Sequence, residues 1–187
     1  MFERFTKDAR EVVRGAVVHC ERSRARHVDA EHILLAVLDR EAGRAAFALT
    51  ALGLAERAES VRRELDEARR HAGLSRAQTD ALAGLGIDVS EIVSRVEEVH
   101  GVGAMSGDRK DGRGWSGRRP FGRDAKDVLV RALRAALAHS DRHIGDEHVL
   151  LALTTGPGVP AEVLADHGVT YESLTRVLYG GGEARAS

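Results

Sequence analysis

The chain has 187 residues, which is one large domain or two small ones, and a chain of this length buries roughly 70% of its unfolded surface. Hydrophobic residues make up 43% and charged residues 30%, and no apolar run reaches the roughly 18 residues of a bilayer span; this excludes wholesale disorder and membrane residence. The 28 basic and 29 acidic residues give a net charge of -1, without the basic excess of a dedicated nucleic-acid binder.

The N-terminal residues MFERFTKDAR are charged from residue 3 and contain no apolar stretch, so we expect no secretory signal. Cys20 is the single cysteine, which excludes an internal disulfide and a cysteine-rich zinc site. We therefore expect a cytoplasmic protein that has neither a membrane nor a nucleic-acid partner.

A first set of four helices is predicted over residues 1–70. Apolar residues at positions 12, 13, 16, 17 and 20 have the spacing of an amphipathic helix, and Thr6 precedes them as an N-cap. A second helix begins near Asp29 and ends near Gly43. A short third helix ends at Gly53, and a fourth follows to residue 70.

Two segments of different composition come next. Residues 71–100 align around Gly86 with the helix–glycine–helix pattern around Gly53, which predicts an inserted helical half-unit at about 76–99. Residues 101–119 contain six glycines and more basic than acidic residues, which is typical of a flexible linker. At the other end of the chain, residues 181–187 are expected to form a frayed tail.

Residues 120–180 repeat the first set. Between the segments 5–37 and 121–153, 12 of 33 aligned positions are identical, and after a one-residue deletion the match continues to the pair Gly53 and Gly168. This internal duplication predicts an all-α fold of two four-helix repeats related by a pseudo-twofold axis. The repeats should share one core, because about 60 residues bury an apolar stripe poorly alone.

These residues resemble the N-terminal Clp repeat domain found at the front of the Clp family of AAA+ protein unfoldases. The resemblance is carried by the opening Met-Phe-x-Arg-Phe-Thr and by Glu-His-(Ile/Val)-Leu-Leu in both copies, and it covers about 5–65 and 120–180. The chain is similar most of all to the Clp-C-type branch and to stand-alone proteins that carry this domain without a motor. A Gly-x-x-x-x-Gly-Lys-(Ser/Thr) phosphate loop is absent from the sequence, so we expect no ATP hydrolysis and no enzymatic activity.

The resemblance implies a phosphoarginine pocket in each repeat. In the family, a threonine at the start of the first helix and backbone amides hold the phosphate, and the Glu of Glu-His holds the guanidinium. The matching residues are Thr6, Glu31 and Glu147, whereas Gly122 replaces the second threonine. The Gly-Thr that precedes Glu-His in the family is replaced by Asp29-Ala30 and Gly145-Asp146, and the added carboxylates would repel a phosphate.

The resemblance also implies a groove on the seam between the repeats, where cyclic peptide antibiotics bind some family members. The residues at matching positions are Phe2, Arg10, Phe121 and Lys126, and Val130 replaces a glutamate. We expect Phe2 and Phe121 to lie close together on this seam, because the resemblance favours an arrangement in which the two first-helix starts are near each other. Aromatic side chains flanked by cations suit an apolar peptide ligand.

The two Glu-His motifs also allow a metal site. His27, Glu31 and His32, and the equivalent His143, Glu147 and His148, contain metal-ligating residue types. The spacing fits neither His-Glu-x-x-His nor His-x-x-Glu-His, and it supplies no dedicated third ligand. Histidines packed at a helix start, with a glutamate favoured by the helix dipole, are the structural interpretation, and we expect no metal and no other cofactor.

Three functions follow from these observations. The leading hypothesis is a non-enzymatic protein- or peptide-binding module of the Clp proteolytic system, an adaptor or regulator whose partners are Clp unfoldase or protease components or their substrates. The second hypothesis is a decoy that sequesters Clp-targeting cyclic peptides. The third is a metal-dependent hydrolase at the Glu-His sites.

Overall fold

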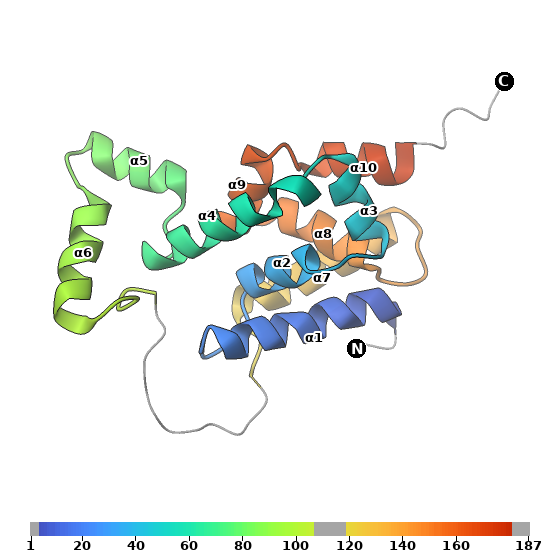
Figure 1. Ribbon diagram of the computed structural model, residues 1–187. Coiled ribbons are helices and arrows are strands. Elements are labelled where there is room, and N and C mark those ends of the chain that lie inside the picture. The colour runs from blue at the N-terminus through green and yellow to red at the C-terminus, as the bar shows by residue number, and fades with distance from the viewer. Residues whose placement is uncertain (1–3, 107–118, 181–187) are drawn as a thin grey trace.

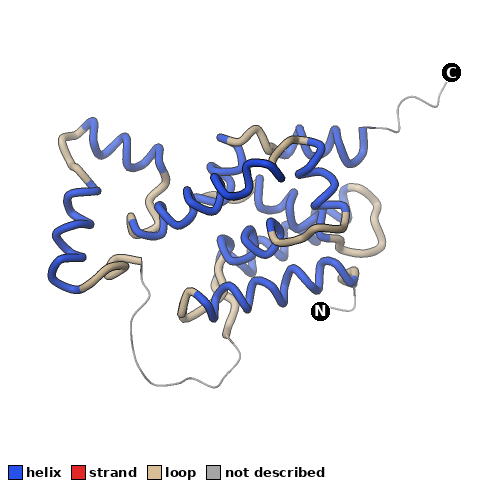
Figure 2. Tube along the Cα trace, viewed as in Figure 1, coloured by secondary structure: helices blue, strands red, loops and turns tan. Residues whose placement is uncertain are grey.

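The computed structural model describes residues 4–106 and 119–180, and within these ranges the chain is helical and contains no strand (Figures 1 and 2). Phe2, most of the expected linker and the expected tail lie outside the described residues. The helices are α1 (Lys7–Arg22), α2 (Ala30–Leu38), α3 (Arg44–Ala51), α4 (Ala58–Arg70), α5 (Arg76–Gly84), α6 (Val89–His100), α7 (Arg123–Ala138), α8 (Asp146–Thr154), α9 (Val159–Asp166) and α10 (Tyr171–Tyr179), with a 3-10 turn, η2 (Ala55–Arg57), before α4.

The predicted duplication is confirmed helix by helix. Helices α1 and α7 each have 16 residues, α2 and α8 each have 9, and α3 and α9 each have 8. Helix α4 is longer than its equivalent α10, with 13 residues against 9. The all-α fold with two four-helix repeats is therefore the observed architecture.

The first helix of each repeat buries the stripe that its sequence predicts. The buried residues of α1 are Ala9, Val12, Ala16 and Cys20, and those of α7 are Ala125, Val128, Leu129, Ala132 and Ala136. Thr6 caps α1, because its hydroxyl oxygen accepts a hydrogen bond from the Ala9 N–H at 3.2 Å. Gly122 occupies the equivalent position of α7 and has no side chain to do so.

In each repeat, the short segment that precedes the first helix pairs with a loop of the other repeat. Phe5 pairs with Ile144 in the loop before α8, and Phe121 pairs with Val28 in the loop before α2. The backbone hydrogen bonds of these two pairs measure between 2.7 and 2.9 Å. Because each pair has its equivalent in the other repeat, the repeats are related by a pseudo-twofold axis, and each repeat completes the other.

Helices α2 and α8 form the centre of one shared core. Ile33 and Leu34 of α2 and Leu150 and Leu151 of α8 are completely buried. Each such side chain contributes about 1.5–3 kcal/mol to the free energy of folding through the apolar surface it removes from water. The core therefore belongs to both repeats at once, as the sequence predicts.

The inserted segment forms a helical arm beside this core. Helix α5, Gly86 and helix α6 make up the expected helix–glycine–helix unit, and Gly86 has a φ of +81°, a conformation that favours glycine. None of the nine residues of α5 is buried, and α6 buries only Val89 and Val93. Figure 1 shows the arm extending beyond the C-terminal end of α4, away from the two repeats.

Candidate functional site

A histidine closes the start of α8. The Gly145 N–H donates to His148 Nδ1 at 2.9 Å, so the ring proton lies on Nε2. His148 Nε2 is 3.0 Å from an Asp141 carboxylate oxygen and 3.0 Å from the Tyr179 hydroxyl. Burial lowers the pKa of His148, which favours the neutral ring that this arrangement requires.

His32 also lies at the start of α2, but its Nε2 is 3.1 Å from the Arg69 guanidinium, which can only donate a hydrogen bond. The Asp29 N–H donates to His32 Nδ1 at 3.2 Å, and an Asp29 carboxylate oxygen accepts from the His32 backbone N–H at 3.0 Å. His32 is completely buried, with its Nε2 2.9 Å from the Ser23 hydroxyl oxygen. Both histidines therefore fasten a helix start, which is the structural interpretation of the Glu-His motif.

The glutamate of the first motif holds an arginine from α4. A carboxylate oxygen of Glu31 lies 3.2 Å from the Arg69 guanidinium, and both side chains are only 15% exposed. Burial raises the pKa of Glu31 to about 7; Arg69 opposes this shift and the nearby Asp29 carboxylate reinforces it. The carboxyl group that the family uses to receive a guanidinium is thus already paired within this chain.

The glutamate of the second motif holds an arginine from the other repeat. Glu147 lies 2.8 Å from the Arg44 guanidinium, and its side chain is 6% exposed whereas that of Arg44 is 47% exposed. Arg44 also lies 5.1 Å from the ring centroid of Tyr179 and donates to the Leu178 carbonyl oxygen at 3.3 Å. A buried carboxylate is therefore covered by a half-exposed guanidinium.

Carboxylates also occupy two helix N-termini that could receive an anion. Asp124 accepts a hydrogen bond from the Ala30 N–H of α2 at 3.0 Å, and Asp146 accepts one from the Ala45 N–H of α3 at 3.0 Å. Burial raises the pKa of Asp146 to about 6; the Ala45 N–H opposes this shift, and the neighbouring Glu147 adds to it. A phosphate would have to displace these carboxylates from the backbone amides.

Thr6 and Glu31 are not brought to one site. Thr6 donates its backbone N–H to the Ile144 carbonyl oxygen at 2.9 Å, so it lies beside the loop that precedes α8 and the Glu147 motif. Gly122, the equivalent of Thr6, donates to Val28 beside the start of α2. Each pocket would therefore combine the first-helix start of one repeat with the second-helix start of the other.

The structure describes three of the four residues expected on the seam groove. Phe121 is half-buried and packs against the core, Lys126 is exposed on the first turn of α7, and Arg10 is exposed on the first turn of α1. Each first-helix start pairs with a loop of the other repeat. The expected approach of Phe2 to Phe121 stays a prediction. Phe2 lies outside the described residues.

Sequence reasoning missed three residues of these sites: Arg44, Arg69 and Asp124. They lie 103, 38 and 94 residues along the chain from the residues they contact, and none belongs to a motif. The one available signal was the duplication itself, because a pseudo-twofold arrangement places residues of one repeat beside the motif of the other.

The two paired repeats, each with its Glu-His helix start, match a known family. The family model described as Clp repeat (R) N-terminal domain matches residues 4–96 and 120–183. The chain belongs to this family. The Clp repeat domain described here is 30% identical, over 175 residues, to the ATP-dependent Clp protease ATP-binding subunit ClpA homolog of Cyanidium caldarium. The aligned residues make up 93% of this chain but only 16% of that relative.

A solved structure has the same fold as this Clp repeat domain. The N-terminal domain of the caseinolytic protease associated chaperone ClpD from Arabidopsis thaliana superposes with a TM-score of 0.53 at 18% identity, covering 97% of this chain and 96% of that one. At this identity the likeness concerns the fold. Within the described residues of the Clp repeat domain, no helix has the length and apolar character needed to cross a membrane.

In the described residues of the Clp repeat domain, the potential ligands of the two Glu-His motifs are only partly gathered at one place. Among the described residues, one group of potential ligands lies within 4.8 Å, and it consists of Asp141, Glu147 and His148. Both ring nitrogens of His148 have hydrogen-bond partners, and the Arg44 guanidinium already neutralises Glu147. His143, which the proposed constellation requires, is exposed and outside this group, as is His27 in the first repeat.

Proposed function

We propose that this Clp repeat domain is a non-enzymatic protein- or peptide-binding module of the Clp proteolytic system, acting in the cytoplasm as an adaptor or regulator of substrate recognition. Its partners are Clp unfoldase or protease components or their substrates. Membership in the Clp repeat family supports a role in this system. The chain spans 16% of the curated relative, so the activity of such a whole protein enters only through this proposal.

The observation that carries the proposal is that the glutamate of each Glu-His motif holds a guanidinium, at 3.2 Å in the first repeat and 2.8 Å in the second. A buried carboxylate that binds one arginine can exchange it for an arginine of a ligand at little net cost, because the ion pair is replaced and not lost. Arg44 is the easier of the two to displace, since its side chain is 47% exposed whereas that of Arg69 is 15% exposed.

The same geometry favours unmodified arginine over phosphoarginine. The amides of Ala30 and Ala45, at two helix N-termini where an anion could bind, already donate to the carboxylates of Asp124 and Asp146. A dianionic phosphate placed beside these carboxylates is repelled, and more strongly where water is excluded. The proposal is therefore a receptor for arginine side chains of a peptide.

The test compares two dye-labelled octapeptides, (Arg-Ala)4 and (Lys-Ala)4, by fluorescence anisotropy. We expect tighter binding of the arginine peptide, because a lysine cannot replace the planar guanidinium fork. Arg44→Ala should increase this preference by exposing Glu147, and the pair Glu31→Gln and Glu147→Gln should abolish it. Arg14→Ala, which breaks an exposed pair with Glu11, is the matched control. An unchanged preference in the glutamate pair would remove the support for the proposal.

The decoy hypothesis has no observation in its favour. It depends on Phe2 beside Phe121, yet Phe2 lies outside the described residues and Phe121 packs against the core. The hydrolase hypothesis includes His27 and His143 as ligands, and neither belongs to the one group of potential ligands among the described residues, Asp141, Glu147 and His148. The observations therefore support the decoy and hydrolase hypotheses less well than the peptide-binding proposal.

A further inference from the structure

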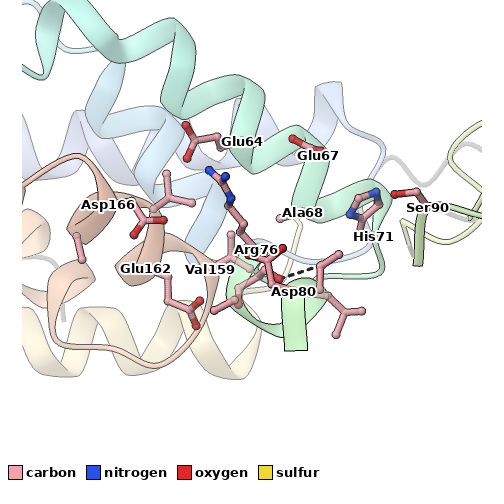
Figure 3. A pocket seen from close by; sticks show the side chains of 16 residues that line it. Glu64, Glu67, Ala68, His71, Arg76, Asp80, Ser90, Val159, Glu162 and Asp166 are labelled. Carbon is pink, nitrogen blue, oxygen red and sulfur yellow. Dashed lines mark hydrogen bonds between the residues drawn. The ribbon is translucent and has the colours of Figure 1, made fainter. Parts of the chain in front are cut away.

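A cleft of about 680 Å³ lies where the inserted arm meets the two repeats. Its walls come from the C-terminal half of α4, from α5 with the first turn of α6, and from α9 of the second repeat (Figure 3). We call it the α4–α9 cleft. Its volume falls within the range of roughly 300–1,000 Å³ that is typical of ligand sites.

Carboxylates dominate the lining of the α4–α9 cleft. Five of them line it: Glu64, Glu67, Asp80, Glu162 and Asp166. Glu64 lies 3.0 Å from His167 Nε2, whereas in the described part of the chain the other four take part in no ion pair. A concave surface lined by one sign of charge concentrates the electrostatic potential and attracts ligands of the opposite sign.

One arginine of the chain's own already reaches into this surface. Arg76 is the single lysine or arginine among the lining residues, and Figure 3 shows it extending from α5 toward Glu64 on α4. It forms no ion pair within 4.0 Å with a described carboxylate. Arg76 therefore offsets part of the negative charge without neutralising any one carboxylate.

The floor of the cleft is apolar. Ala68 of α4 and Val163 of α9 are buried there, and Leu74 and Val159 are half-buried beside them. Lysine and arginine side chains can lay their methylene stems on such a surface while their charged ends reach the surrounding carboxylates. The combination suits long basic side chains better than a small ion.

A metal ion fits the cleft poorly. Within the described ranges, no three of these carboxylates bring ligand atoms within 4.8 Å of one another. A hard cation such as Ca²⁺ needs six to eight oxygen ligands at about 2.3–2.6 Å, which carboxylates spread around a cleft of this size do not supply.

We propose that the α4–α9 cleft binds a lysine- or arginine-rich segment of a partner protein, with the basic side chains paired to Glu67, Asp80, Glu162 and Asp166. Charge complementarity and the apolar floor both support this occupant. The inference rests on the proposed function in one respect, namely that the chain binds peptides, but it concerns a different surface. The inserted arm, which supplies α5 as a wall, thereby adds a site of its own to the two repeats.

The experiment titrates dye-labelled (Lys-Ala)4 into the whole chain at low ionic strength and follows its anisotropy. We expect saturable binding, about tenfold weaker in the double variant Glu67→Gln with Glu162→Gln, because two charge pairs are lost. Arg76→Gln should tighten binding about threefold by removing the competing cation. The matched control is Glu56→Gln with Glu172→Gln, two exposed carboxylates outside the cleft, which should change the affinity less than twofold.

Several results would overturn the proposal. Binding that is unchanged in the cleft variant, or equally weakened in the control, would show a diffuse charge effect. Equal binding of (Glu-Ala)4 would show that the cleft does not select a basic peptide. Displacement of the peptide by spermidine, added at an equal concentration of positive charge, would show the same. The pair Glu31→Gln and Glu147→Gln should leave (Lys-Ala)4 binding unchanged, so failure of this inference is separable from failure of the arginine sites. Thermal midpoints within a few degrees of wild type confirm that each variant is folded.

Discussion

Two carboxyl groups at the helix starts have pKa values well above the usual range. Burial raises the pKa of Glu31 from 4.5 to about 7 and that of Asp146 from 3.8 to about 6. The folded state therefore holds these protons more tightly than the unfolded state does. The resulting stability is fully present below the unfolded pKa values and falls as the pH rises through the folded values, between about pH 4 and 7.

This gives a prediction for Glu31→Gln. The neutral amide resembles the protonated acid, so the variant should lose the part of the pH dependence that Glu31 causes. Between pH 5 and pH 8 the wild-type free energy of unfolding should fall by on the order of 2 kcal/mol more than that of the variant. Urea unfolding at the two pH values measures this. Glu59→Gln, at a side chain that is 88% exposed, is the control, and equal pH dependence in all three proteins would contradict the assignment.

The helix start of α3 shows how one element depends on the other repeat. Gly43 precedes α3 with a φ of +111°, and a Cβ there would overlap the Asp146 carboxylate that bonds to Ala45. Gly158 precedes α9 at the equivalent position with a φ of +101°, but a Cβ there would meet nothing within 4 Å. The two glycines share a backbone conformation and differ in their surroundings.

Alanine at the two positions should therefore have unequal effects. Gly158→Ala should cost about 1–2 kcal/mol of unfolding free energy through backbone strain alone. Gly43→Ala should cost at least about 1 kcal/mol more, because it also displaces the buried Asp146 carboxylate. Chemical unfolding of the two variants measures the difference. Equal losses would mean that Asp146 does not fix the start of α3.

The helices could be predicted from the sequence, whereas the sites could not. Helices α1 and α7 follow from the spacing of their apolar residues, and the duplication follows from aligned identities, because both signals are local or internal to the sequence. The partners of Glu31 and Glu147 are Arg69 and Arg44, and only the folded chain brings these arginines close to the two glutamates. The pairing of Thr6 with the loop of the other repeat was equally hidden, since the sequence assigns each pocket to one repeat.

At the scale of the whole molecule, the pairing of each first-helix segment with the other repeat makes the two repeats one folding unit. The start of each first helix is completed by the other repeat, and α2 and α8 bury their leucines against a common core. A fragment of residues 119–180 loses both, so it should show the far-ultraviolet circular dichroism of a largely unfolded chain. The whole chain should unfold in a single transition. A stably helical fragment would show that the repeats fold independently.

The central claim is that this Clp repeat domain binds peptides or proteins of the Clp system and so alters substrate recognition. The most direct measurement follows the degradation of dye-labelled casein by the purified Clp unfoldase and protease of the host while the chain is titrated in. The account predicts a saturable change in the degradation rate, lost when Glu31→Gln is combined with Glu147→Gln and retained in the Arg14→Ala control. A rate that stays constant up to tens of micromolar chain, with no binding of the chain to the unfoldase or to casein, would contradict it.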